Sequence, residues 1–453
     1  MGEIPKSYKD EKPEFGHPML KYYALDPEYI NLNSGSYGTP PKPVLRAIED
    51  ITARIESNPD YFIRIALQPL LTNVREKLAT LVGAKTDEVV LVANASVGVN
   101  TVLRNIEWEE GDIIFAFTTT YGSISKTVQY LSDVPPHPTP SVIVLNFPTT
   151  HEEIVKEFRK HLLDNPAKPN KRRVAVIDSI VSNPGVSLPW KEMVKVCKDE
   201  GVWSLIDAAH SIGQEVGLNL TEAAPDFWVS NCHKWLSAKR SCAVLYVPER
   251  NQHIIKSSIP TSATYISPKD RTGPNFVEQF DWNGTIDYAP YLAVVDALEF
   301  REWMGGEEKI NAYCHDLAIK GGQVLAKVLG TQVIDPEGDL TLNMVNVALP
   351  IPGSIHFTPA VNASLMNKML GQKAYSAHFY HNGGWWTRCS AQVWNEVSHC
   401  FRYLSSSIFD AIMSFVGRKM QQLEDFEKMG KIWLEVCNSV KEEIGSSQGD
   451  TRA

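Results

Sequence analysis

The residues best suited to chemistry stand just after two short apolar runs. The first run, residues 203–206, ends in Asp207, and His210 follows three positions later. The second run, residues 227–229, is followed by Ser-Asn-Cys-His and then by Lys234. A lysine in an apolar setting loses part of its preference for the ammonium form, and its amine becomes nucleophilic. The spacing therefore predicts a lysine that can form a Schiff base, with an acid from a neighbouring strand.

A lysine and an acid at two strand ends suit pyridoxal 5′-phosphate (PLP). Lys234 would hold the cofactor as a Schiff base, and Asp207 would face the pyridinium nitrogen and keep it charged. Each residue also has a plainer interpretation, because a lone acid at a strand end usually caps a turn and a single lysine usually reaches solvent. The ordered series of polar positions along the chain favours the cofactor.

Three further positions extend this series. Ser96 stands at a strand-to-helix junction, where free amides and the helix dipole favour a phosphate, although it could simply be an N-cap. Tyr121 follows a strand end, where ligands of open α/β sheets bind, and it could stack on a flat ring or only fill the core. Arg388 lies within an apolar strand and needs a partner, either a substrate carboxylate or a structural acid.

The elements that would position these residues alternate between short apolar runs and helical periodicity. Such runs without clean alternation are typical of strands covered on both faces, and the helices between them indicate βαβ units. The predicted fold is α/β, with a mostly parallel seven-stranded sheet and a smaller α+β C-terminal domain. The predicted strands cover residues 89–93, 113–117, 142–147, 174–180, 203–207, 227–230 and 242–247, then 340–349 and 385–393. The predicted helices cover residues 42–55, 69–82, 152–163, 190–200, 291–304 and 307–330.

These elements suggest three parts of the chain. Residues 1–60 form an N-terminal arm with an active-site loop, residues 61–290 the large domain and residues 291–453 the small domain. The loop, residues 31–41, reads NLNSGSYGTPP, and its glycines and prolines predict irregular backbone. It is either a plain surface loop or one whose backbone approaches a ligand closely.

Composition narrows the classes of function. The net charge of −9 over 453 residues, without a long basic run, disfavours nucleic acid and acidic membranes as partners. No apolar run reaches the roughly 18 residues that span a bilayer, and the N-terminus lacks the apolar core of a signal peptide. The seven cysteines form no C-x-x-C pair, so we expect a reduced, cytoplasmic protein without a metal site.

At these residues the sequence resembles the class V aminotransferase, or cysteine desulfurase-like, family of fold-type I PLP enzymes. The motifs NCHKWL, residues 231–236, and LIDAAHSIG, residues 205–213, carry the resemblance, which covers nearly the whole chain. It points to a fungal branch similar to isopenicillin N epimerase. That branch includes hercynylcysteine sulfoxide lyase, the C–S lyase of ergothioneine synthesis, and PLP enzymes of secondary metabolism.

The resemblance implies a role for each candidate residue. Lys234 carries the Schiff base, Asp207 binds the pyridine nitrogen, Tyr121 stacks on the ring, and His210 supports the ring's other side or its oxygen. Ser182, or Asn183 beside it, contacts the ring hydroxyl. The phosphate lies against Ser96, the amides of Ala95 and Val97, Asn231 and His233. Thr285 reaches the phosphate of a neighbouring subunit, which implies a homodimer with a shared active site. The substrate carboxylate meets Arg388, near the loop residues Asn33 and Ser34.

Three features depart from the family. The loop is often N-H-G-S-F-G, and here Ser34 replaces the imidazole. Lys-Arg-Ser at residues 239–241 replaces a usual P-R-G. Residues 397–422 interrupt a segment that is nearly continuous in relatives. Because valine codons begin with GT and glutamine can be encoded CAG, this stretch is either a translated, unspliced intron or a genuine helical insertion.

The resemblance predicts a PLP-dependent lyase acting on an amino acid. Lys234 would remove the α-proton, a leaving group on the β-carbon would depart, and Tyr121 could protonate it. C–S cleavage, as in hercynylcysteine sulfoxide lyase, is the expected outcome. The alternatives are a secondary-metabolite enzyme that performs C–C cleavage, γ-carbon chemistry, epimerisation or transamination, and a non-catalytic PLP-fold binding protein. Cysteine desulfurase activity is disfavoured, because no S-S-G-S-A-C-like loop is present and Cys389 lies in a predicted strand.

Overall fold

The computed structural model of the chain describes residues 8–256, 259–262, 264–396 and 425–449. Two compact units make up the fold. The first comprises residues 1–13, 21–24 and 34–312, and the second comprises residues 14–20, 25–33 and 313–453. The sequence placed the division at residue 290, whereas α12 (Val294–Met304) packs against α2 (Lys42–Ser57) in the first unit.

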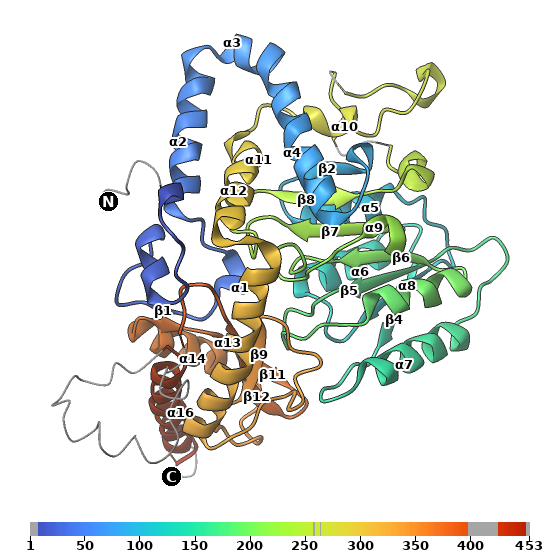
Figure 1. Cartoon of the computed structure of the whole chain (residues 1–453). Coiled ribbons are helices and arrows are strands. Elements are labelled where there is room, and N and C mark those ends of the chain that lie inside the picture. Colours follow the sequence, from blue (N-terminus) through green and yellow to red (C-terminus); the bar gives the residue numbers. More distant parts are fainter. Residues whose placement is uncertain (1–7, 257–258, 263, 397–424, 450–453) are drawn as a thin grey trace. The chain divides into compact units, whose positions relative to one another are not determined.

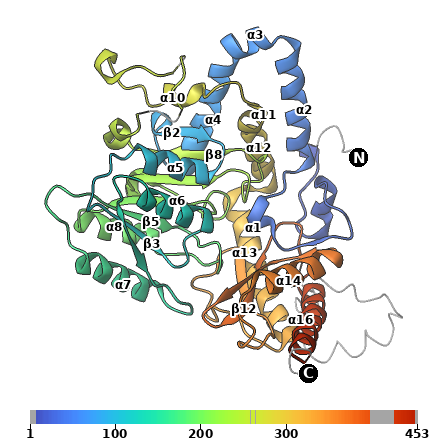
Figure 2. The ribbon, with the colours of Figure 1, turned by 180° about the vertical axis from the view of Figure 1, so that it is seen from behind.

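The first unit contains the predicted seven-stranded sheet, whose order is β2-β8-β7-β6-β5-β3-β4. Only β8 runs antiparallel to its neighbours. Helices α5 (Ala95–Asn105) and α6 (Gly122–Asp133) cover one face and α8 (Trp190–Asp199) the other (Figures 1 and 2). The central strands are buried because both faces are covered. The strands are β2 Val89–Val92, β3 Ile113–Phe117, β4 Thr139–Ile143, β5 Arg173–Asp178, β6 Trp203–Asp207, β7 Phe227–Asn231 and β8 Ala243–Tyr246.

Strand β4 corrects one prediction. The sequence placed it at residues 142–147, but it spans Thr139–Ile143. Its register pairs Ile113 with Thr139 and Phe117 with Ile143, so it ends where its only neighbour, β3, ends. Apolar residues continue beyond the strand, and Val144 is 67% exposed. The apolar run therefore predicted that a strand exists at this sheet edge, but not the residues at which it begins and ends.

The helices around this sheet begin and end at recognisable signals. Helix α4 (Leu67–Val82) ends at Gly83, whose φ of 64° suits the left-handed conformation of a helix C-terminus. Helix α7 (His151–Asp164) begins with a capping box between Thr150 and Glu153. The predicted helix at 291–304 is divided into α11 (Ala289–Leu292) and α12.

The loop at residues 31–41 is more regular than predicted. A four-residue helix, α1 (Ser34–Tyr37), occupies its centre. The Gly38 amide donates to the Ser34 carbonyl at 2.7 Å, and Gly38 has a φ of 65°. Glycine thus ends a short turn of helix that the composition had suggested would be irregular.

The second unit is an α+β assembly, as predicted. Its antiparallel sheet has the order β11-β12-β9, formed by Ala377–His381, Gly384–Ser390 and Met344–Ala348. A parallel pair joins β1 (Ile30–Asn31) to β10 (Ala374–Tyr375). Helices α14 (Pro359–Gly371) and α16 (Asp425–Gly449) belong to this unit, and α13 (Gly306–Leu329) leads into it. The predicted insertion at 397–422 lies outside the described residues.

No helix in the described part of the chain is both long and apolar enough to cross a membrane.

Candidate cofactor and active site

Lys234 lies in the turn that follows β7. Its Nζ is 3.1 Å from Nε2 of His210 and 5.9 Å from the centre of the Tyr121 ring. The next residue, Trp235, donates from its indole nitrogen to Nδ1 of His210 at 3.1 Å. The fold therefore brings together three predicted site residues from separate loops at the carboxyl edge of the parallel strands, where open α/β sheets bind ligands.

Asp207 ends β6 and is buried. Its Oδ1 accepts a hydrogen bond from the Ala209 amide at 3.1 Å. Burial raises the pKa of Asp207, while the nearby Lys234 and the Ala209 hydrogen bond act in the opposite direction. The carboxyl group thus has the location expected of a partner for a cationic ring nitrogen.

A second carboxyl group, Asp178, stands beside Asp207 and was missed. Asp178 ends β5, is in register with Asp207, and is equally buried. Its Oδ2 has no hydrogen-bond partner among the described residues. Burial and the charge of Asp207 raise the pKa of Asp178 well above its ordinary value, whereas Lys234 lowers it. The sequence did contain a signal, because Asp178 ends an apolar run just as Asp207 does, but the predicted strand extended past it.

The N-terminus of α5 supplies the predicted phosphate site, with some amides already engaged. The Ala95 amide donates to Asn231 Oδ1 at 2.9 Å, and the Val97 amide donates to Asn94 Oδ1 at 2.9 Å. Asn94 is the N-cap that the sequence had assigned to Ser96 as an alternative. Ser96 itself lies in the first turn, where helix amides lack intrahelical acceptors. The Ser96 hydroxyl and amide and the Asn231 side-chain amide are therefore the best-placed donors here.

His233 is half-buried in the turn before Lys234. Its Nδ1 is 3.3 Å from the Cys242 carbonyl oxygen, which can only accept. Burial, followed by the charges of Lys234 and Arg240, lowers the pKa of His233 to about 4. The ring is consequently neutral near pH 7, with its proton on Nδ1.

The loop that carries α1 lies against the lysine turn. A Cβ atom at Gly38 would come within 1.5 Å of the His233 carbonyl oxygen, so only glycine fits. Arg240 donates to the carbonyl oxygens of Tyr37 at 3.1 Å and of Gly38 at 3.0 Å. The backbone of this loop thus approaches the segment that bears Lys234 closely, while its approach to a ligand stays a prediction.

The remaining cofactor candidates are less enclosed. Ser182, four residues beyond β5, is half-buried, and Asn183 after it is exposed. Thr285 is exposed, as a residue that serves a neighbouring subunit would be in a single chain. Their assigned roles remain predictions.

Arg388 lies in β12 of the second unit and is buried. Its Nη2 donates to Oδ1 of Asn33 at 3.1 Å. Ser34, which belongs to the first unit, is buried, and its hydroxyl has no hydrogen-bond partner among the described residues.

Two other chemistries lack support in the described residues. Cys389 is buried within β12, and burial raises the pKa of its thiol to about 12, so it is a poor nucleophile. No three His, Cys, Asp or Glu side chains in the described ranges are grouped as metal ligands would be.

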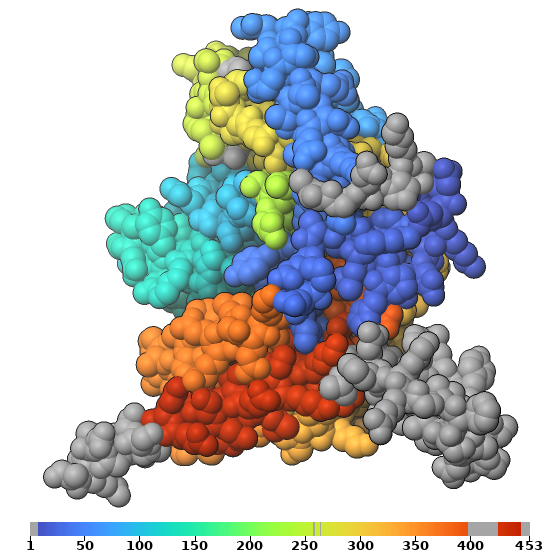
Figure 3. Space-filling view, turned by 90° about the vertical axis from the view of Figure 1, so that its left-hand side faces the viewer, coloured from blue at the N-terminus to red at the C-terminus, as the bar shows by residue number. Residues whose placement is uncertain are grey.

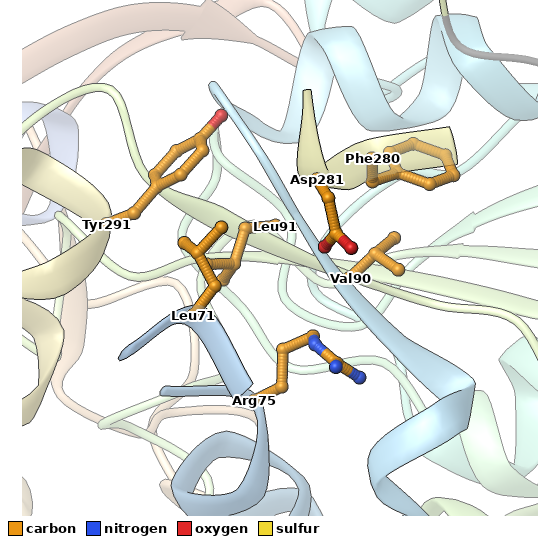
Figure 4. Close-up of a pocket in the computed structure, with 7 residues that line it drawn as sticks. All are labelled: Leu71, Arg75, Val90, Leu91, Phe280, Asp281 and Tyr291. Carbon is orange, nitrogen blue, oxygen red and sulfur yellow. The ribbon is translucent and has the colours of Figure 1, made fainter. Parts of the chain in front are cut away.

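One small pocket in the first unit is separate from Lys234. Arg75 and Asp281 point into it between α4, β2 and α11 (Figure 4). Its volume of about 10 Å³ would hold a single water molecule at most. It is therefore a packing feature and not a cofactor site.

Comparison with known proteins agrees with this geometry. The profile of the aminotransferase class-V family matches residues 31–357. The L-cysteine desulfhydrase-like protein lolT1 of Epichloe uncinata is 36% identical, over 90% of this chain and 98% of the relative. Hercynylcysteine sulfoxide lyase of Schizosaccharomyces pombe is 32% identical, over 88% and 98% respectively. The solved structure of the cystine C-S lyase C-DES has a TM-score of 0.67 at 18% identity, covers 83% of this chain and 95% of its own, and confirms the fold.

The residues present fit PLP, the cofactor of this family. Lys234 provides an amine at a strand end, the carboxyl groups of Asp207 and Asp178 stand beside it, and the first turn of α5 offers donors to a phosphate. An unpartnered, buried carboxyl oxygen on Asp178 is what a missing cationic group would leave. By profile, identity and geometry the chain belongs to the aminotransferase class-V family, as a PLP-dependent lyase.

Proposed function

We propose that this lyase cleaves the C–S bond of an S-substituted cysteine or of its sulfoxide. The observation that carries the proposal is the Lys234 amine, 3.1 Å from a buried histidine and next to two buried carboxyl groups. The names of the relatives support this class of substrate, since they include a hercynylcysteine sulfoxide lyase and a cysteine desulfhydrase-like protein.

When bound, PLP supplies an electron sink for the negative charge that develops at the substrate α-carbon. Asp207 holds the ring nitrogen, and the donors of α5 hold the phosphate. Arg388 binds the substrate carboxylate through its guanidinium fork, with Asn33 fixing the orientation of that fork.

Lys234 then acts as the base at the α-carbon. Tyr121 is exposed, and its ring centre is 5.9 Å from Nζ, so its hydroxyl can protonate a sulfur leaving group. The C–S bond breaks as the α-proton leaves, and the three-carbon fragment hydrolyses to pyruvate and ammonia. The sulfur leaves as a thiol or, from a sulfoxide, as a sulfenic acid.

The proposed assembly is a homodimer in which Thr285 reaches the partner's phosphate. Tyr61 and Ile65, in the stretch that joins α2 to α4, are large apolar side chains that are 59% and 61% exposed. This mid-blue stretch projects at the top of the surface in Figure 3. An exposed apolar ridge on a helix pair is suited to contact with another chain.

Pyruvate formation from hercynylcysteine sulfoxide and from L-cysteine tests the substrate. We expect pyruvate from the sulfoxide, and the Lys234→Ala variant should lose both pyruvate release and the absorbance of the bound cofactor. Sulfide release from L-cysteine alone would favour desulfhydrase activity. A lack of turnover with both, in protein that still binds PLP, would contradict the proposal.

A further inference from the structure

Three side chains form a hydrogen-bonded row that ends at the reactive amine. Nε1 of Trp235 lies 3.1 Å from Nδ1 of His210, and Nε2 of His210 lies 3.1 Å from Nζ of Lys234. Trp235 is 1% exposed and His210 is 2% exposed. Solvent therefore does not compete for the Trp235–His210 bond.

The direction of each bond follows from what an indole can do. An indole N–H only donates, so Nδ1 of His210 must accept and carries no proton. In a neutral imidazole the proton then resides on Nε2, which faces Lys234. Because Nε2–H donates, the lysine nitrogen must accept with its lone pair, which an ammonium group does not have.

Hydrogen bonds from Arg301 hold the backbone on either side of this row. The guanidinium of Arg301, on α12, donates to the Trp235 carbonyl at 2.8 Å and to the Gly213 carbonyl at 3.0 Å. It also pairs with Glu307 at 2.5 Å. The Gln214 side chain donates to the His210 carbonyl at 3.0 Å. One buried arginine thus ties together the two segments that carry the indole and the imidazole.

The other groups that face Lys234 do not require it to be cationic. Asp207 and Asp178 are the nearby acids, and burial raises the pKa of both. His233 is neutral near pH 7, because its pKa is lowered to about 4. Tyr121 presents its ring face to the amine. The electrostatic pull towards an ammonium form is therefore weaker than two fully ionised carboxylates at these positions would produce.

We propose that Trp235 is a positioning residue for Lys234: its indole N–H fixes the Nε2–H tautomer of His210, which donates to the lysine nitrogen and holds it as a free base. This inference rests on the proposed role of Lys234 as the residue that binds PLP. Protonation of His210 would require loss of the Trp235 bond, so the row keeps the amine ready to bond to the cofactor aldehyde at neutral pH.

The test compares Trp235→Phe with Trp228→Phe. Trp228 is also fully buried, but its indole nitrogen has no hydrogen-bond partner in the described part of the chain. The control therefore loses similar volume without losing a hydrogen bond. Cofactor-free full-length protein is mixed with PLP between about pH 6 and pH 9, and the rate at which the cofactor band appears is divided by the wild-type rate.

We expect W235F to react about fivefold more slowly than wild type near pH 6.5 and to approach the wild-type rate near pH 9, since one ordinary hydrogen bond is lost. W228F should keep the wild-type pH dependence. A W235F rate that is reduced equally at every pH, or not reduced at all, would overturn the inference, because a packing role has no pH signature.

Two further variants keep the test decisive if W235F does not fold. In His210→Gln, the side-chain amide can donate to Lys234 and accept from Trp235, so this variant should keep the wild-type pH dependence of the rate. His210→Phe can make neither hydrogen bond and should lose that pH dependence. Equal profiles for these two variants would also overturn the inference. If Lys234→Ala still forms the cofactor band, the proposed role of Lys234 fails instead, and the two failures are distinguishable.

Discussion

At the scale of single residues, Asp178 and Asp207 are two buried acids side by side at the ends of adjacent strands, and their ionisation lowers the stability of the fold. A group whose pKa is raised on folding stabilises the protein fully below its unfolded pKa, near 3.8, and that contribution is lost as pH rises through the folded value. Removing the titrating group at Asp178 should therefore raise the stability of the cofactor-free protein most at high pH.

We predict that Asp178→Asn raises the melting temperature relative to wild type, with a difference that grows from about pH 5 to about pH 8. Asp112→Asn is the matched control, because Asp112 is buried but accepts hydrogen bonds from the amides of Glu109 and Arg172, both at 2.8 Å. That control should be less stable than wild type throughout. A D178N difference that shrinks with pH would show that Asp178 is ionised in the fold.

His233 has the opposite dependence on pH. Its pKa falls from 6.5 to about 4 on folding, so its contribution is present above the unfolded value and is lost as pH falls through the folded one. The difference amounts to about 3 kcal/mol at most. Urea denaturation of cofactor-free His233→Asn, whose side chain can still donate to Cys242, should show a smaller loss of stability between pH 6.5 and 4 than wild type. Equal losses would contradict the assignment.

At the scale of elements, the loop after Lys234 contains a serine in a strained backbone conformation. Ser241 has a φ of 77°, in the region that favours glycine, and the P-R-G pattern expected from the family resemblance has glycine at this position. With Lys239 and Ser241 in place of proline and glycine, the chain adopts the glycine-type backbone conformation at the expense of strain at Ser241. In this conformation Arg240 donates hydrogen bonds to the α1 loop.

We predict that Ser241→Gly stabilises the protein by about 0.5–1 kcal/mol, measured by urea denaturation. Ser267→Gly is the control, since Ser267 has a φ of −54° and glycine there only adds freedom to the unfolded chain. It should be neutral or destabilising. A loss of stability in S241G would mean that the serine side chain outweighs the backbone strain.

At the scale of the whole molecule, the stretch at 397–422 is the one that the sequence predicted to be either an unspliced intron or a helical insertion. The residues that flank it meet, because Asn395 Nδ2 donates to Asp425 Oδ2 at 2.9 Å and the Glu396 amide donates to the same oxygen at 3.3 Å. Residues 396 and 425 therefore lie at one place in the second unit.

A variant that lacks 397–422 should fold with unchanged PLP content and a melting temperature equal to or above that of the full chain, because a shorter connection between residues 396 and 425, which already meet, costs less entropy to close. Absorbance and thermal melting measure both. Deletion of the 24 residues of α13 serves as the control, and should abolish folding. Transcript sequencing tests the intron hypothesis separately, and a mature message that retains the stretch in active protein would contradict it.

The homodimer is also a prediction at this scale. Sedimentation or light scattering should give a mass of two chains, and Ile65→Lys should weaken association because it places a charge on the exposed apolar ridge between α2 and α4. Glu56→Lys, on an exposed polar position of α2, is the control. A monomer with full activity would contradict the shared active site.

Local sequence determined which segments become strands and helices, and it singled out Lys234 and Asp207 as candidate site residues. The reason is that buried parallel strands need apolar runs, so a polar residue at the end of a run is conspicuous. The same logic failed at β4, where an edge strand leaves apolar residues exposed, and it passed over Asp178 because the apolar pattern continues beyond that acid.

Only the tertiary structure decided which polar groups meet. The sequence analysis gave Trp235 no role, and nothing in its spacing from His210 indicated a hydrogen bond. Strand order places β5, β6 and β7 side by side, and this alone brings Asp178, Asp207 and the Lys234 turn to one edge. Residue types thus indicated the cofactor and a candidate lysine for it, whereas the sheet's register and the folded chain decided which side chains lie next to that lysine.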